Sequence, residues 1–255
     1  MLLLLSVLAA TYLGLCAILF FVQRALVFPA PRDRDSPGSA AIVDVPGGTP
    51  MLWRPADAGG PVVVHFHGNG EQVGGLAWLG EKLATGRASF AAVEYPGYPG
   101  AAGTPSEASI LAAAEVALEH LTGPMGVARN RIVLSGQSLG TGVAVRLAAN
   151  GWGTRLVLLS PYTSMTAVAE QGIYRLFPVR LLLRDRFDSE QLAPRIQLPV
   201  LVLHGTRDEV VPFALGRALS ARFPRARFVE VPGAGHNDLW EHPITPSEYL
   251  GFVTR

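Results

Sequence analysis

A serine flanked by glycines is the residue best placed for chemistry in this chain. Ser138 stands in the string Gly136-Gln-Ser-Leu-Gly140, after an apolar run at 131–135 and before a helical pattern at 141–150. A sharp strand-to-helix turn of this kind exposes the serine hydroxyl, and it requires small residues two positions before and after the serine. A glycine-rich turn without catalytic function has the same letters, so the neighbouring elements carry the argument. Their order predicts that Ser138 is a nucleophile.

Two later residues supply the partners that a serine nucleophile needs. Asp208 closely follows the apolar run 199–204, and His236 follows the run 227–231 in a glycine-containing loop. All three residues lie past the C-terminal ends of predicted strands, where open α/β sheets place their sites. His236 would take the proton of Ser138 and return it to the leaving group, while Asp208 would orient the imidazole. We therefore predict a Ser138–Asp208–His236 triad.

The loop at 67–70 is a candidate for holding negative charge. It reads His-Gly-Asn-Gly and follows the β-branched run 61–66, which is typical of a strand buried on both faces. The backbone N–H groups of Asn69 and of Leu139, which follows the serine, would donate hydrogen bonds to an oxyanion. This chemistry requires no metal and no organic cofactor, so we expect neither.

Other polar residues have simpler interpretations. Asp185 and Asp188 also lie between the serine and the histidine, but they fall in a segment that interrupts the strand–helix alternation. His65 and His67 alternate along one predicted strand, but no third metal ligand has suitable spacing. We interpret both as core or loop histidines, and His204 as a structural residue at a strand end.

The elements around these residues predict the fold. From residue 40 onward, short apolar runs alternate with helical patterns, which predicts a mostly parallel, doubly wound sheet in a single domain at 40–255. Residues 162–198 exceed one crossover helix and predict a helical cap insertion. Segments 104–107 and 245–248 both read Thr-Pro-Ser-Glu, and each is predicted to start a helix with the threonine as N-cap.

The N-terminal segment predicts a membrane anchor. Residues 1–22 carry no charged side chain, and as a helix they would span roughly 33 Å, enough for the hydrocarbon core of a bilayer. We predict a transmembrane helix at 1–23 and a linker at 24–39. A cleaved signal peptide is the alternative, but residues 22–26 offer a poor cleavage context and no basic segment precedes the apolar run.

Basic residues flank only the C-terminal side of this helix, which favours a single-pass protein with its catalytic domain in the cytoplasm. They are Arg24, Arg32 and Arg34.

Composition excludes several classes of function. A net charge of +1 with 16% charged residues provides no basic surface for nucleic acid. An apolar content of 49% argues for a large core rather than disorder. Cys16 is the single cysteine, which excludes a disulfide framework or a thiolate zinc site within one chain.

Five short strings together resemble the α/β-hydrolase superfamily, and within it the membrane-anchored abhydrolase-domain 13 and 17 proteins. The strings are HGNG at 67–70, EYPGY at 94–98, GQSLG at 136–140, HGTRD at 204–208 and GAGHND at 233–238. The resemblance covers about residues 40–255 and includes the order Ser…Asp…His. It implies an α/β-hydrolase fold with a helical cap and an acyl-enzyme formed on Ser138. The chain departs from some lipases because Asn69 replaces part of their triple-glycine loop.

These observations predict a membrane-anchored serine hydrolase that cleaves carboxylic esters or thioesters. Its partners would be a small-molecule or acyl-group substrate, and membrane lipid through the N-terminal helix. A serine aminopeptidase and a non-catalytic binding protein at the membrane are the alternatives. The apolar and basic mixture at 174–186 is typical of a membrane-facing lid and equally of a packed cap over the pocket.

Overall fold

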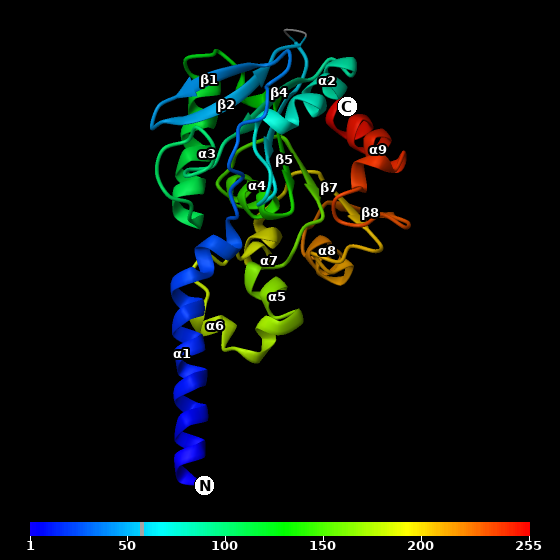
Figure 1. The fold of residues 1–255 in the computed structure, drawn as a ribbon. Coiled ribbons are helices and arrows are strands. Elements are labelled where there is room, and N and C mark those ends of the chain that lie inside the picture. Colours follow the sequence, from blue (N-terminus) through cyan, green and yellow to red (C-terminus); the bar gives the residue numbers. More distant parts are fainter. Residues whose placement is uncertain (57–58) are drawn as a thin grey trace.

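The computed structural model describes residues 1–56 and 59–255, and within them eight strands form one sheet (Figure 1). The order is β1-β2-β4-β3-β5-β6-β7-β8, with antiparallel pairing of β1 with β2 and of β2 with β4, and parallel pairing throughout the rest. This confirms the predicted α/β sheet. The strands are β1 (Ala41–Val45), β2 (Thr49–Arg54), β3 (Val62–Phe66), β4 (Ser89–Val93), β5 (Ile132–Gln137), β6 (Arg155–Leu159), β7 (Val200–Gly205) and β8 (Ala226–Val231).

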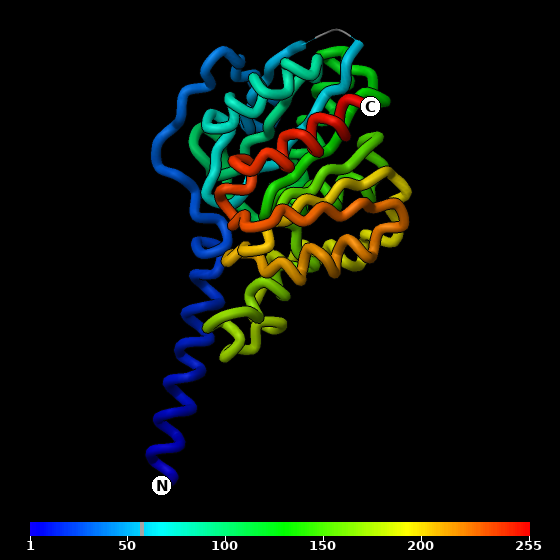
Figure 2. The backbone as a smooth tube through the Cα atoms, turned by 90° about the vertical axis from the view of Figure 1, so that its right-hand side faces the viewer, coloured from blue at the N-terminus to red at the C-terminus, as the bar shows by residue number. Residues whose placement is uncertain are grey.

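Helices cover both faces of the sheet. Side chains of α3, α4 and α8 belong to the core on one face, and α2 and α9 lie together on the other face (Figure 2). The α-helices are α1 (Leu2–Val27), α2 (Ala77–Thr85), α3 (Glu107–Thr122), α4 (Leu139–Ala149), α5 (Met165–Ala169), α6 (Val179–Leu182), α7 (Ser189–Leu192), α8 (Phe213–Ser220) and α9 (Ile244–Val253).

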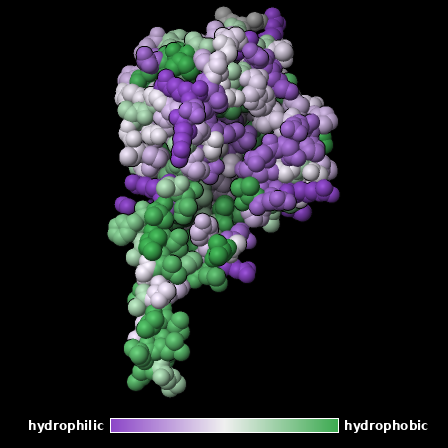
Figure 3. All heavy atoms as spheres, in the orientation of Figure 1, coloured by the Kyte–Doolittle hydropathy of each residue, from purple (hydrophilic) through white to green (hydrophobic). Residues whose placement is uncertain are grey.

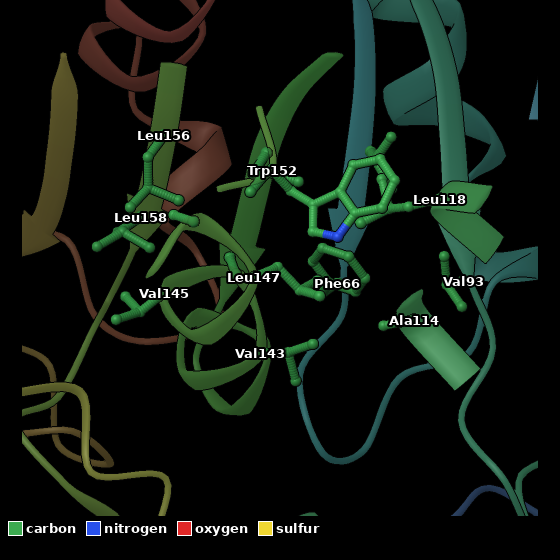
Figure 4. Packing of buried hydrophobic residues seen from close by; sticks show 14 of the residues in the cluster. Phe66, Val93, Ala114, Leu118, Val143, Val145, Leu147, Trp152, Leu156 and Leu158 are labelled. Atoms are coloured by element: carbon green, nitrogen blue, oxygen red, sulfur yellow. The ribbon is translucent and has the colours of Figure 1, made fainter. Parts of the chain in front are cut away.

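Strand β3 shows why the central strands are apolar throughout. Val64 and Phe66 pack into the core on the α4 face, whereas Val63 between them packs into the core on the α2 face. Figure 4 shows Phe66 beside Val143 and Leu147 of α4. Because side chains alternate between two buried faces, every position of the strand has to be apolar or have a polar partner.

The predicted threonine caps are wrong at both helix starts. Ser106, not Thr104, is the N-cap of α3, and its side chain exchanges hydrogen bonds with Ser109 in a capping box. Helix α9 has Pro243 as its N-cap, and Thr245 lies inside its first turn. In both cases the helix start lies two residues away from the expected threonine.

Helix α1 extends away from the domain, with an apolar surface along its length (Figures 1 and 3). Among the described residues it is the helix that is long and apolar enough to cross a membrane. It runs through Val27, so it includes residues 24–27 of the expected linker. Phe28, directly after it, is buried in the core with its ring 6.4 Å from that of Phe187. The helix is therefore tied to the domain at its C-terminal end.

The insertion leaves the sheet after β6 and lies beside the C-terminal part of α1 (Figure 1). Its two ends meet where the Met165 N–H donates to the Arg186 carbonyl at 2.7 Å. Glu107 accepts hydrogen bonds from the backbone N–H groups of Arg186 and Phe187 at 2.8 and 3.0 Å. The carboxylate of Glu107, the first residue of α3, therefore fixes the base of the insertion.

Candidate active site

Ser138 occupies a strained turn between β5 and α4. Its backbone has φ 49° and ψ −119°, a conformation that costs a non-glycine residue about 1–3 kcal/mol. A Cβ on Gly136 would collide with the carbonyl of Gly140, and one on Gly140 would collide with the carbonyl of Phe66. The Ser138 N–H donates to the Leu159 carbonyl of β6 at 2.9 Å. Close backbone packing thus holds the serine in its turn and explains both glycines.

The structure brings Ser138, Asp208 and His236 together from the ends of β5, β7 and β8. His236 Nε2 lies 3.0 Å from Ser138 Oγ, and its Nδ1 lies 2.8 Å from Asp208 Oδ2. The Asp208 carboxylate is buried, and the His236 side chain is 10% exposed. Because an ionised carboxylate only accepts hydrogen bonds, Nδ1 carries the proton and Nε2 is available to accept the serine proton.

The Asp208 carboxylate has partners for both oxygens. Its Oδ1 accepts from the N–H groups of Val210 and Val211 at 3.0 and 2.8 Å. Burial opposes ionisation, but hydrogen bonds from His204 and His236 hold the pKa of Asp208 well below its usual value of 3.8. Asp208 is therefore ionised at neutral pH and can stabilise an imidazolium.

His204 supports Asp208, a role that the sequence did not indicate. Its buried Nε2 lies 3.0 Å from the Val211 carbonyl and 3.3 Å from Asp208 Oδ2. The ring packs so closely on Gly216 of α8 that any Cβ there would collide with Nδ1. The spacing of His204 and Asp208 in HGTRD was the available signal, but it does not indicate in which direction the histidine ring points.

The other acidic candidates lie in the insertion. Asp185 accepts from Arg24 Nε at 3.0 Å and from the Glu107 N–H at 2.8 Å. Asp188 is the N-cap residue of α7. The contacts of Asp185 are with α1 and α3, so Asp208 is the acid in contact with His236.

The loop after β3 lies against the serine. A Cβ on Gly68 would be 3.6 Å from that of Ser138, and the Gly68 N–H already donates to Glu71 Oε2 at 2.5 Å. Asn69 is exposed, and its carbonyl accepts from the Tyr98 hydroxyl at 2.6 Å. Leu139 is the first residue of α4, where its N–H has no carbonyl partner within the helix. Asn69 and Leu139 thus stay the predicted oxyanion donors.

A buried cluster fixes the start of this loop. His67 Nε2 lies 3.0 Å from Glu94 Oε1, and its Nδ1 lies 2.7 Å from the Gly68 carbonyl. The Tyr95 ring stacks on the imidazole with centroids 3.9 Å apart, and the Tyr95 hydroxyl donates to the His67 carbonyl at 2.7 Å. Glu94 and Tyr95 of the string EYPGY therefore position the loop, a role that the sequence alone did not indicate.

His65 and His67 do not face a common ligand. His65 Nδ1 lies 3.0 Å from Ser135 Oγ, which also accepts from the Tyr249 hydroxyl at 2.7 Å. Burial and the neighbouring His67 lower the pKa of His65 to about 3, so it is neutral near pH 7. Among the described residues, no group of three or more His, Cys, Asp or Glu side chains is arranged to hold a metal ion.

Comparison with known proteins agrees with this geometry. Residues 178–243 match the family described as alpha/beta hydrolase fold. The chain is 34% identical over 196 residues to mouse alpha/beta hydrolase domain-containing protein 17C, covering 74% of this chain and 58% of that protein. The chain belongs to the α/β-hydrolase superfamily. This confirms the resemblance to domain 17 proteins, although the chain spans little more than half of the mouse protein.

Two further matches cover a larger share of the matched protein. An uncharacterized protein of Mycobacterium tuberculosis (strain ATCC 25618 / H37Rv) is 36% identical over 217 residues, covering 83% of this chain and 74% of that protein. The crystal structure of a membrane phospholipase A matches with a TM-score of 0.63 at 19% identity, covering 99% of this chain and 96% of that chain. At this identity the second match supports the fold alone.

Proposed function

We propose that this protein is a membrane-anchored serine hydrolase that cleaves carboxylic esters or thioesters through an acyl-enzyme on Ser138. The observation that carries the proposal is the continuous hydrogen-bond chain from Ser138 Oγ through His236 to Asp208, at 3.0 and 2.8 Å. The strained turn of Ser138 adds support, because backbone strain persists at functional sites where the surrounding structure maintains it. A non-catalytic binding protein would gain nothing from either feature.

The reaction follows from these contacts. His236 Nε2 accepts the proton of Ser138 as Oγ attacks the acyl carbon, and Asp208 stabilises the imidazolium that forms. The N–H groups of Asn69 and Leu139 donate to the oxyanion, and each such donor contributes about 3–4 kcal/mol to catalysis. His236 then protonates the departing alcohol or thiol. Water, activated by the same histidine, hydrolyses the acyl-enzyme and restores the serine.

Helix α1 supports the membrane-anchored part of the proposal. The hydroxyls of Ser6 and Thr11 donate to the carbonyls four residues earlier, at 3.0 and 2.9 Å, which is how hydroxyls are satisfied within an apolar helix. Contacts of Gln23 and Arg24 with the insertion favour an uncleaved helix, since signal cleavage near residue 25 would remove them. Because basic residues follow the span, we further propose a cytoplasmic catalytic domain.

A fluorophosphonate probe tests the enzymatic part directly. Full-length wild-type protein should be labelled covalently, and Ser138→Ala should not be labelled while keeping its melting temperature. Folded wild-type protein that resists labelling would overturn the proposal. A panel of p-nitrophenyl esters, acyl thioesters and aminoacyl amides then distinguishes the substrate classes. Turnover of the amides alone would replace the esterase by a serine aminopeptidase.

A further inference from the structure

The outer part of the insertion, residues 172–182, exposes large apolar side chains. Ile173, Leu176 and Leu181 are 69%, 64% and 81% exposed. Figure 3 shows the apolar surface of α1 continuing onto the neighbouring insertion. Single exposed apolar residues are common on proteins, but a continuous apolar patch indicates an interaction surface.

Helix α1 contacts this outer segment along much of its own length. The Tyr12 hydroxyl donates to the Leu176 carbonyl at 3.0 Å, and the Tyr12 ring stacks on Phe177 with centroids 5.8 Å apart. Nearer the domain, Gln23 Nε2 donates to the Leu182 carbonyl at 3.0 Å. The outer segment therefore runs beside α1 from Tyr12 to Gln23.

An apolar environment would require protein partners of this kind for the backbone of the outer segment. Gln23 is only 8% exposed, and its Oε1 also accepts from the Arg184 N–H at 2.8 Å. Leu176 and Leu182 are the last residues of two short helices, so their carbonyls lack partners within the helix. Water would satisfy such carbonyls at no cost, whereas lipid cannot, so at membrane depth they need partners from protein. The polar side chains of an otherwise apolar helix satisfy backbone groups of the insertion. This pairing favours lipid as the surroundings of the outer segment.

The geometry limits how deep the segment reaches. Residues 2–22 of α1 would cover roughly 31 Å, close to the thickness of the hydrocarbon core. Tyr12 stands near the middle of that stretch, and about 16 Å of helix separates it from Gln23. The outer segment therefore extends through about one leaflet. The charge of Arg180 is paired within the insertion, where its Nε donates to Glu170 Oε1 at 2.7 Å, and such pairing lowers the cost of a charge near lipid.

An apolar crevice lies between α1 and the insertion. It is open to the surroundings and is lined by side chains that include Leu19 and Leu26 of α1 and Phe177 and Leu183 of the insertion. An apolar lining of this kind suits an acyl chain rather than a polar ligand. At the base of the insertion, the Tyr162 hydroxyl donates to the Leu139 carbonyl at 3.2 Å, which connects the insertion to the serine turn.

We propose that residues 172–182 are immersed in the leaflet that surrounds the C-terminal half of α1, and that the crevice seats an acyl chain of a membrane lipid. The triad then receives acyl substrates from the bilayer rather than from water. This inference rests on the proposed function, because it assumes that α1 spans a membrane and that Ser138 attacks an acyl ester or thioester.

Depth-dependent quenching tests the immersion. Full-length protein carrying Cys16→Ala is given one cysteine, as Leu181→Cys, Leu13→Cys or Ile42→Cys, labelled with a bimane fluorophore, and reconstituted in phosphatidylcholine vesicles with brominated acyl chains. Leu13 on α1 and Ile42 on β1 are 65% and 42% exposed and serve as controls for membrane and water. We expect the label at 181 to be quenched as strongly as that at 13, and several-fold more than that at 42.

Quenching at 13 but not at 181 would overturn the immersion and leave the anchored hydrolase intact. Absence of quenching at 13 would overturn the membrane anchor itself, and with it this inference.

Charge substitutions test the consequence for catalysis. Leu181→Glu should lose on the order of tenfold in the hydrolysis of a long-chain ester held in phosphatidylcholine vesicles, because a carboxylate is costly within lipid. It should hydrolyse a short, water-soluble p-nitrophenyl ester at the wild-type rate. Ile42→Glu should change neither rate. An unchanged rate of Leu181→Glu on the vesicle-held ester would contradict delivery from the bilayer.

Discussion

The serine turn and the outer segment of the insertion satisfy the hydrogen-bonding groups of their backbones in different ways. Both lie between strands of the sheet rather than within one. At the serine turn, the Ser138 N–H is satisfied by the Leu159 carbonyl of a neighbouring strand, and glycines allow the backbones to touch. In the outer segment, backbone groups are satisfied by Tyr12 and Gln23 of α1, and large apolar side chains remain exposed.

The difference shows which part of the molecule depends on its surroundings. The serine turn is fixed by the sheet, so its geometry is the same in water, detergent or lipid. The outer segment depends on α1 and on what surrounds α1. Changes at the turn should therefore abolish chemistry on every substrate, whereas changes at the insertion should affect only the encounter with lipid.

The largest expected effect is that of Asp208→Asn. An amide at this position no longer fixes the tautomer of His236 or stabilises its protonated form, so kcat for a short p-nitrophenyl ester should fall about 10³-fold or more. Asp188→Asn, in the insertion, is the matched control and should retain nearly full activity. Steady-state kinetics of the two variants measure the difference, and a larger loss in the Asp188 variant would assign the acid to the insertion.

A smaller but clear loss of stability is expected for Gly140→Ala. The added methyl collides with the Phe66 carbonyl, so the free energy of unfolding should fall by about 3 kcal/mol or more and labelling of Ser138 should be lost. Gly251→Ala in α9, where a Cβ would meet nothing within 4 Å, should instead be neutral or stabilising by up to about 1 kcal/mol. Urea denaturation of both variants makes the comparison, and equal midpoints would contradict the close packing.

The pH dependence of stability should report the buried His65. Its pKa is about 3 in the folded protein and about 6.5 when unfolded, so the unfolded chain binds the extra proton between these values. Stability from this group is complete above pH 6.5 and decreases by about 1.4 kcal/mol per pH unit as the pH falls towards 3. Asp208, whose pKa is also lowered, adds to the loss only below its usual value of 3.8.

Urea midpoints at pH 7.5 and pH 5 measure this dependence. The wild-type protein should lose about 2 kcal/mol of unfolding free energy between them, and His65→Gln should lose clearly less. The same slope in both proteins would mean that His65 takes up its proton in the folded state.

The smallest effect is expected for Gln23→Leu, which removes hydrogen bonds between α1 and the insertion. The Leu182 carbonyl and the Arg184 N–H lose their partners, at a cost of about 1–3 kcal/mol confined to this region. Limited proteolysis in detergent should become faster within residues 172–182, while fluorophosphonate labelling of Ser138 stays at the wild-type level. Phe21→Leu, an exposed position of α1, is the control. Reduced labelling of Gln23→Leu would show that the serine turn also depends on the contacts between α1 and the insertion.

Prediction from the sequence is strongest where the information is local. A serine two residues from each of two glycines, between a strand and a helix, is enough to indicate the strained turn. Asp208 and His236 could be added because the C-terminal ends of parallel strands meet at one edge of a sheet. Their roles in catalysis stay predictions, but their proximity follows from topology that the apolar runs already indicated.

Prediction is weakest where a partner lies far along the chain. Thr104 was expected to cap α3, but Ser106 does so, and Glu107 binds backbone groups about 80 residues away. His204 could not be seen to support Asp208, because the direction of its ring is fixed by packing on Gly216.

The sequence by itself determined the parallel sheet, the turn around Ser138, the order of the triad residues and an apolar helix long enough to span a membrane. Each follows from a short-range pattern: alternation, spacing, or the absence of charge. Only the tertiary structure decided that Tyr12 and Gln23 of that helix bind the insertion. Those hydrogen bonds join residues roughly 160 positions apart, and nothing within either segment specifies the other until the chain has folded.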